Sequence, residues 1–110
     1  MSALEQGDII ELDFTPAVGH EPAKRRPAVV ASVYGFNSRS SLVMVVPITS
    51  TDNGYPLHVP VRARNVEGFA VVEATRALDV EQRGYRIVGS VDDVTMRAIM
   101  SKLRGIFGLR

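Results

Sequence analysis

The amino-acid sequence predicts a mainly β protein with one C-terminal α-helix, folded as a small, partly open barrel of the SH3-like type. Two observations indicate this fold class. Up to residue 90, short apolar or alternating runs are separated by turns rich in Gly, Pro, Asn and Asp, which is the pattern of an all-β domain. From residue 92 onwards, apolar residues recur every three or four positions, as on one face of a helix. Because the strands are short, the sheet has to curl on itself to bury both a core and its own edges.

The predicted strands follow the apolar runs. Pro27 is compatible with a strand start, since proline is tolerated at the first residue of a strand. Pro56 and Pro60 instead mark the segment between them as a half-exposed edge strand. The expected strands are residues 8–14, 27–32, 42–47 and 57–61, then 68–73 and 75–78 as one bent or two short strands, and finally 87–90. Residues 34–41 are expected to form a turn region, and residues 48–50 to leave the sheet.

The predicted C-terminal helix begins near Asp92 and ends at Gly108, a residue typical of helix C-termini. Asp92 and Asp93 lie in its first turn, where carboxylates complement the positive end of the helix dipole. One apolar stripe is expected to face the core, and a basic face to stay outside. The stripe consists of Met96, Ile99, Met100, Leu103, Ile106 and Phe107, and the basic residues are Arg97, Lys102 and Arg104.

The aromatic residues divide into two groups. Phe69 and Phe107 are expected in the core. His58 alternates with two apolar neighbours and is therefore expected to face away from the core. Four other aromatic residues lie in or beside loops, where they could stack on nucleic-acid bases; these are Phe14, Tyr34, Phe36 and Tyr55.

Length and composition indicate a single domain, residues 1–110, with one core. Apolar residues make up 45% of the chain and charged residues 23%, which predicts a soluble globule rather than a disordered chain. The absence of cysteine excludes disulfides, thiolate nucleophiles, zinc ribbons and iron–sulfur sites, and fits the reducing cytoplasm. No apolar run is long enough to span a bilayer, so no membrane partner is expected. Since the net charge is only +1, affinity for a nucleic acid has to come from local clusters of basic residues.

One such cluster lies in the loop between the first two predicted strands. Between Gly19 and Pro27 the loop holds an imidazole, a carboxylate and three cations, namely His20, Glu21, Lys24, Arg25 and Arg26. Acid–base groups and guanidinium groups held together in a loop on a rigid scaffold suit chemistry on a phosphate-bearing partner. A cation-rich loop can also be an ordinary solvated surface, and composition alone leaves both interpretations open.

RNA is a phosphate-bearing substrate that carries its own nucleophile, the 2′-hydroxyl. A protein that cleaves RNA needs only to take a proton from that hydroxyl, stabilise charge on the phosphoryl oxygens and protonate the leaving 5′-oxygen. The products would be a 2′,3′-cyclic phosphate, or its hydrolysed 3′-phosphate, and a 5′-hydroxyl. This reaction requires no metal, no cofactor and no nucleophilic side chain, and the sequence shows no carboxylate cluster suited to Mg²⁺.

Several short segments form a recognisable pattern through their order and spacing along the chain. They are residues 7–10 (Gly-Asp-Ile-Ile) with 13–14 (Asp-Phe), 19–21 (Gly-His-Glu) with 26–27 (Arg-Pro), 47–50 (Pro-Ile-Thr-Ser), 54–56 (Gly-Tyr-Pro) and the helix end at 103–108. Together they resemble the MazF/PemK family of toxin endoribonucleases from type II toxin–antitoxin systems, over nearly the whole chain. The resemblance implies an SH3-like barrel that forms a homodimer and cleaves single-stranded RNA at short sequences without a metal, as an mRNA interferase that inhibits translation. It also implies a cognate antitoxin whose C-terminal segment lies over the RNA groove.

Three residues are the predicted catalytic groups. Arg26, held by the following Pro27, can present a bidentate fork to the scissile phosphate, and the resemblance places the catalytic arginine there. Thr49 ends a predicted strand and can donate its hydroxyl to a phosphoryl oxygen, although a threonine at that place can also simply cap a turn. Glu21 can act as the general base or orient Arg26, or it can be a surface carboxylate. The prediction requires Arg26 and Thr49 to reach the same phosphate.

Other residues are predicted to bind RNA. His20, with a pKa ordinarily near neutrality, suits proton transfer or phosphate contact, and Arg25 and Lys24 add positive charge beside it. The remaining candidates are Ser50 in the Pro-Ile-Thr-Ser segment, Tyr55 in the Gly-Tyr-Pro segment, Glu73 and Arg76. Family members commonly show Asp-Gln where this chain has Glu73 and Ala74, and sometimes a basic residue where it has Val71. Ala74 cannot hydrogen-bond a base, so base recognition is expected to differ here.

Two other classes of function remain possible from the sequence. A toxin of the CcdB type has the same barrel but poisons DNA gyrase and cleaves nothing, and fold alone does not separate it from a ribonuclease. The cation-rich loop between Gly19 and Pro27 favours the ribonuclease, because a gyrase binder has no use for a phosphate site. A peptide-binding SH3-like module relies on an aromatic-lined groove, for which a chain without tryptophan is poorly equipped.

Overall fold

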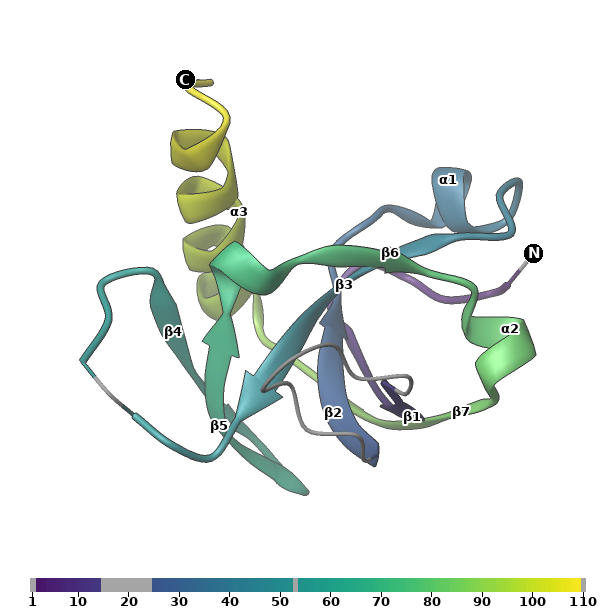
Figure 1. Cartoon of the computed structure of the whole chain (residues 1–110), viewed down its shortest axis with the longest axis horizontal. Coiled ribbons are helices and arrows are strands. Elements are labelled where there is room, and N and C mark those ends of the chain that lie inside the picture. The colour runs from purple at the N-terminus through teal and green to yellow at the C-terminus, as the bar shows by residue number, and fades with distance from the viewer. Residues whose placement is uncertain (1, 15–24, 53, 110) are drawn as a thin grey trace.

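The computed structural model describes residues 2–14, 25–52 and 54–109, and its arrangement is shown in Figure 1. Within these residues the chain forms one curled, seven-stranded sheet and three helices. The strands are β1 (Asp8–Asp13), β2 (Arg25–Val30), β3 (Val43–Thr49), β4 (His58–Ala63), β5 (Val66–Val71), β6 (Arg76–Leu78) and β7 (Tyr85–Ser90). The helices are α1 (Tyr34–Asn37), α2 (Val80–Arg83) and α3 (Asp93–Ile106), and a 3-10 turn, η1 (Val72–Ala74), joins β5 to β6. No helix in this part of the chain is long and apolar enough to cross a membrane.

The sheet runs in the order β4-β5-β3-β2-β1-β7, with β6 paired to β3 as well, and every pair is antiparallel. Strand β3 exchanges partners along its length. Its first five residues, up to Pro47, pair with β2 or β6. Its last two residues, Ile48 and Thr49, pair with Ala70 and Phe69 of β5. The sheet therefore folds over at β3, and β4 and β5 form a second layer beside it (Figure 1).

The strands shared by the two layers are apolar on both faces. Ile9 and Ile10 of β1 are neighbours in sequence and both have no exposed surface, and the same is true of Val45 and Val46 of β3. One face packs on β4, β5 and helix α3, and the other packs on the N-terminal residues, β6 and α2. A strand covered on both faces has a continuous apolar run rather than an alternating one, which accounts for the runs seen in the sequence.

Helix α3 begins at an N-cap. The side chain of Asp92 accepts a hydrogen bond from the backbone N–H of Thr95 at 2.8 Å, and this bonding with Thr95 lowers the pKa of Asp92. Met96 and Ile99 are buried against the sheet. The C-terminal part of α3 extends past the sheet (Figure 1), and Phe107, which follows it, is 73% exposed.

Most predicted elements are confirmed. The mainly β fold with a C-terminal helix, the edge position of β4 and the splitting of residues 68–78 into two strands all appear in the structure. Helix α2 and the single helical turn α1 are additional. The expectation that residues 48–50 leave the sheet is wrong for Ile48 and Thr49, because these residues find a new partner in β5.

Several side chains lie differently from the prediction, among them Ile106, which is 45% exposed, and Phe69, which is only half-buried, although both were expected to face the core. Phe107 is exposed rather than in the core, and Phe14, expected beside a loop, is buried with 6% of its surface exposed. The side chain of His58 is only 7% exposed, because Tyr55 and Glu73 cover it on the side away from the main core. Alternation places a side chain on one face of a strand but does not reveal what covers that face.

Candidate active site

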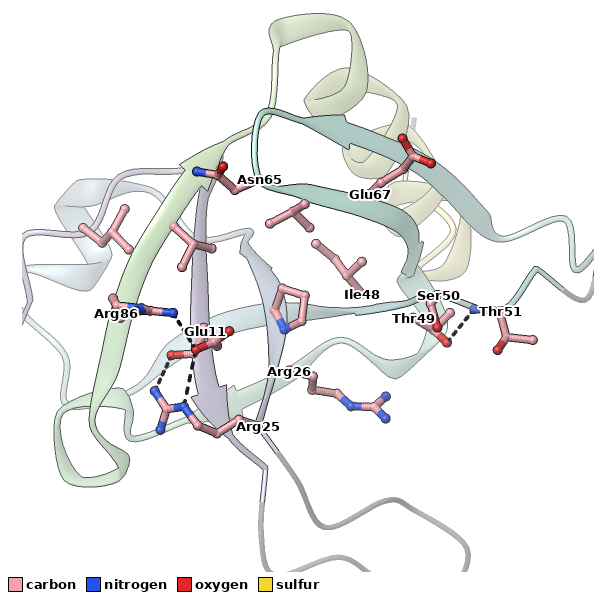
Figure 2. A pocket seen from close by; sticks show the side chains of 14 residues that line it. Glu11, Arg25, Arg26, Ile48, Thr49, Ser50, Thr51, Asn65, Glu67 and Arg86 are labelled. Carbon is pink, nitrogen blue, oxygen red and sulfur yellow. Dashed lines mark hydrogen bonds and ion pairs between the residues drawn. The ribbon is translucent and has the colours of Figure 1, made fainter.

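A groove of about 780 Å³ runs across one end of the barrel, and Figure 2 shows the side chains that line it. The start of β2, the end of β3, the β4–β5 turn, β1 and β7 all contribute to it. Its polar lining residues are Glu11, Arg25, Arg26, Thr49, Ser50, Thr51, Asn65, Glu67 and Arg86, and its apolar lining residues are Pro27, Ile48, Val66, Ile87 and Val88. The lining contains three guanidinium groups and two carboxylates, so its charged groups are positive in sum.

The pairing of β2 with β3 brings Arg26 and Thr49 together. In the observed register Ala28 lies opposite Pro47, Val29 opposite Val46 and Val30 opposite Val45. Arg26 precedes Ala28 by two residues and Thr49 follows Pro47 by two residues, so both stand just beyond the last β2–β3 pair. Figure 2 shows the two side chains at the same end of the groove. Both side chains therefore line one groove, and their contact with the same phosphate stays a prediction.

Among the described residues, the guanidinium of Arg26 has no hydrogen-bond or ion-pair partner. Its Nε is buried and has no hydrogen-bond partner among the residues that the structure describes. No ion pair joins it to a described carboxylate either, in contrast to Arg25 and Arg86. A buried donor without a partner is costly, and a ligand that accepts its hydrogen bond recovers that cost. Arg26 is thus positioned to receive an anion.

Thr49 presents a hydroxyl with a free proton. Its Oγ1 accepts a hydrogen bond from the backbone N–H of Thr51 at 3.2 Å, so the oxygen is held while the proton remains to be donated. None of the described residues (2–14, 25–52 and 54–109) accepts a hydrogen bond from this hydroxyl. The turn-capping role considered from the sequence is real, but it uses the acceptor side of the hydroxyl and leaves the donor side for another group.

The other predicted residues fall into three sets. Arg25 and Ser50 line the groove with Arg26 and Thr49. His20, Glu21 and Lys24 lie outside the described residues. Tyr55, Glu73 and Arg76 do not line this groove: Tyr55 and Glu73 pack around His58, whose Nε2 lies 3.3 Å from Glu73 Oε2, and Arg76 lies on β6 opposite Val45.

Five polar lining residues were not predicted from the sequence, namely Glu11, Thr51, Asn65, Glu67 and Arg86. Glu11 Oε1 lies 3.1 Å from Arg86 Nη2 and 3.6 Å from Arg25 Nε. The available signal was Glu11 itself, a charged residue between the apolar Ile10 and Leu12 of a strand. Its partners depend on the register of β1 with β2 and β7, which the sequence does not reveal.

A small curled barrel with a cationic, hydroxyl-bearing groove at one end defines a domain built to hold an anionic ligand. The sequence model of one protein family, described as the PemK-like, MazF-like toxin of type II toxin–antitoxin systems, matches residues 5–107. The chain therefore belongs to this toxin family, and the resemblance noted from the sequence is confirmed.

Similar proteins support the family and the fold. The chain is 31% identical over 104 residues to the endoribonuclease toxin MazF of Escherichia coli (strain K12), covering 94% of both proteins. It is 31% identical over 111 residues to the endoribonuclease toxin ChpB of the same strain, covering 96% of this chain and 95% of ChpB. Among solved structures, MazF from Deinococcus radiodurans superposes with a TM-score of 0.89 at 30% identity, covering 99% of this chain and all of that one. A MazE–MazF structure from the same organism gives 0.87 at 30% identity with full coverage of both chains.

Proposed function

We propose that this chain is a sequence-specific endoribonuclease toxin that cleaves single-stranded RNA through the RNA's own 2′-hydroxyl, without a metal or cofactor. The observation that carries this proposal is the position of Arg26 and Thr49, which line the same end of a cationic groove and have donors with no acceptor among the described residues. The membership of the toxin family and the naming of its relatives as endoribonucleases support the same activity.

The reaction follows from what these two side chains can donate. A base takes the proton from the 2′-hydroxyl, the 2′-oxygen bonds to phosphorus, and the bond from phosphorus to the 5′-oxygen breaks as that oxygen is protonated. Arg26 donates to the phosphoryl oxygens as their negative charge grows, and Thr49 donates a further hydrogen bond. Glu21 is the proposed base and His20 a proposed proton or phosphate contact, both in the segment that precedes Arg26.

The proposed biological setting follows the family. The enzyme acts in the cytoplasm on mRNA, inhibits translation, and works as a homodimer. A cognate antitoxin neutralises it by laying a peptide segment over the groove, and related toxins have been solved as MazE–MazF structures. Because the groove's charged groups are positive in sum, the segment that covers it is expected to be acidic. Tyr55, Glu73 and Arg76 remain predicted RNA contacts on surfaces outside the groove.

The test is cleavage of a mixed-sequence RNA in the presence of EDTA, followed by analysis of the ends. We expect 5′-hydroxyl ends and 2′,3′-cyclic phosphate or 3′-phosphate ends, and no cleavage where the 2′-hydroxyl at the cut position is replaced by hydrogen. Arg26→Ala should lower kcat by about 10²- to 10³-fold, the usual effect of removing one donor to a developing oxyanion. Arg97→Ala removes the same charge from exposed surface outside the groove and serves as the control.

Two outcomes would overturn the proposal. RNA left intact by the wild-type protein, together with a stable complex with DNA gyrase, would assign the chain to the non-cleaving class of toxin. Cleavage that leaves 5′-phosphate ends would show that water, and not the 2′-hydroxyl, attacks the phosphorus.

A further inference from the structure

A second cationic cluster lies in the groove, and it is organised around Glu11. Arg86 Nη2 donates to Glu11 Oε1 at 3.1 Å, and Arg25 Nε lies 3.6 Å from the same oxygen. Arg25 is held a second time, since its Nη2 donates to the backbone carbonyl of Glu11 at 3.1 Å. Figure 2 shows both guanidinium groups converging on Glu11. One carboxylate therefore sets the position of two cations.

The cluster contributes little to the stability of the fold. The side chain of Arg86 is 71% exposed and that of Arg25 is 48% exposed, and ion pairs at such exposed places contribute about 0–1 kcal/mol. Ordering two long side chains also opposes folding, because both lose rotamer freedom. The exposed edges of both guanidinium groups remain able to donate to an anion in the groove.

The sheet separates Arg86 of this cluster from Arg26. In the observed register Arg86 of β7 lies opposite Glu11 of β1, and Glu11 lies opposite Pro27 of β2, the neighbour of Arg26. Arg86 and Arg26 thus stand on strands that flank β1, two strand spacings or about 10 Å apart at the backbone. Both line the same groove. A continuous polyanion lying in the groove would present one phosphate near Arg26 and a different one near Arg86.

We propose that Arg86 and Arg25, held in place by Glu11, bind a backbone phosphate of the RNA next to the one that is cleaved. This inference rests on the proposed ribonuclease function. Arg86 contributes affinity and sets which phosphate reaches Arg26, because anchoring a neighbouring phosphate fixes the register of the strand in the groove. It takes no part in bond breaking, and Glu11 acts as a positioning residue through the two arginines.

Binding is measured with an RNA that carries hydrogen in place of the 2′-hydroxyl at the cut position, so that it cannot be cleaved. For single-stranded nucleic acid, each phosphate contact contributes about 0.7 to the slope of log affinity against log salt concentration. We expect Arg86→Ala to make that slope shallower by about 0.7 and to raise KM several-fold with a much smaller change in kcat. Arg86→Lys keeps the charge and should restore most of the slope, and Arg97→Ala should leave it at the wild-type value.

A scan of neutral methylphosphonates, one phosphate at a time, locates the contact. At one position beside the cut, the neutral phosphate should weaken binding to the wild type but cause no further loss with Arg86→Ala, because the two changes remove the same contact. Glu11→Gln should weaken this coupling, since neither arginine then has a charged anchor. The melting temperatures of the variants should stay close to that of the wild type, which separates a lost contact from a lost fold.

The outcomes distinguish this inference from the proposed function. If the wild type leaves RNA intact, the ribonuclease proposal fails and the role of Arg86 fails with it. If the wild type cleaves RNA but Arg86→Ala has the same salt slope as Arg97→Ala, only the role of Arg86 is overturned. The same holds if the coupling in the methylphosphonate scan appears at the scissile phosphate itself, because Arg86 would then be part of the reacting centre.

Discussion

The substitution Gly68→Ala, which adds a single methyl group, tests whether β5 packs as closely against Thr49 as the structure shows. Gly68 lies in β5 opposite Val61 of β4, next to Phe69, which pairs with Thr49. A Cβ built on Gly68 would lie 2.9 Å from Ile48 Cγ2, about 0.5 Å less than an ordinary van der Waals separation of 3.4 Å, and nearer still to the backbone carbonyl oxygen of Thr49. The carbonyl belongs to the strand and cannot turn away, so β5 and β3 must separate.

The expected cost of Gly68→Ala follows from this crowding. Forcing an extra carbon into a packed interior destabilises a protein by about 1–3 kcal/mol, and the contact with backbone places this change in the upper part of that range. For a chain of this length, about 2–3 kcal/mol corresponds to a fall in melting temperature of roughly 10 °C. Because the strand that moves carries Thr49, kcat/KM should also fall, by up to about 10²-fold for a displacement approaching 1 Å.

The assay is urea unfolding of Gly68→Ala and of the matched control Gly35→Ala, combined with RNA cleavage at a temperature where all variants are folded. A Cβ on Gly35 meets nothing within 4 Å, and this residue lies in helix α1, so the control should be as stable as the wild type or more so. The midpoint for Gly68→Ala should fall with an unchanged m-value. If Gly68→Ala is as stable and as active as Gly35→Ala, the close approach of β5 to Thr49 does not hold.

Three further predictions concern single side chains. Thr49→Val keeps the shape of the side chain and removes the hydroxyl, so kcat should fall by about 10²-fold with little change in melting temperature; an undiminished rate would remove Thr49 from the reaction. Asp92 has a lowered pKa when folded, so its contribution to stability is complete above the unfolded pKa of about 4 and is lost as the pH falls through the folded pKa. Asp92→Asn should therefore lose stability less steeply than the wild type in urea titrations below about pH 4, and parallel curves would contradict the cap. Ile99→Ala, in the core, should cost about 2–5 kcal/mol in unfolding free energy, whereas Phe107→Ala should cost less than about 0.5 kcal/mol, and equal losses would show that Phe107 is buried.

The sequence was sufficient for what depends on local pattern. Apolar runs bounded by turn residues located the strands, and the change of period at Asp92 located helix α3 and the acidic residues of its first turn. Arg26 and Thr49 were predicted because Arg26 stands at the start of a strand and Thr49 at the end of one, each within a segment that resembles the toxin family. The structure then placed both side chains in one groove.

Other features depend on register and on the extent of neighbouring elements, which local pattern does not contain. Arg86 joins the groove because β7 pairs with β1 so that it lies opposite Glu11, and a shift of one residue would turn its side chain to the other face. The periodicity of α3 predicted correctly which face of the helix is apolar. It could not reveal that the sheet ends before Phe107, so that part of the apolar face stays exposed.

The partner exchange of β3 explains both the main error in the strand prediction and the location of the site. Up to Pro47 the strand is paired with β2, and from Ile48 it is paired with β5, so residues 48–50 show no single strand pattern. Beyond the exchange β2 is no longer paired with β3, and the groove lies there, lined by Arg26 of β2 and Thr49 of β3. The backbone of Thr49 is held by its pairing with Phe69 of β5, while its side chain lines the groove. Stabilising a phosphoryl transition state requires a donor that is both fixed and accessible. The pairing with β5 fixes the backbone of Thr49, and the end of the pairing with β2 leaves room beside it for a ligand.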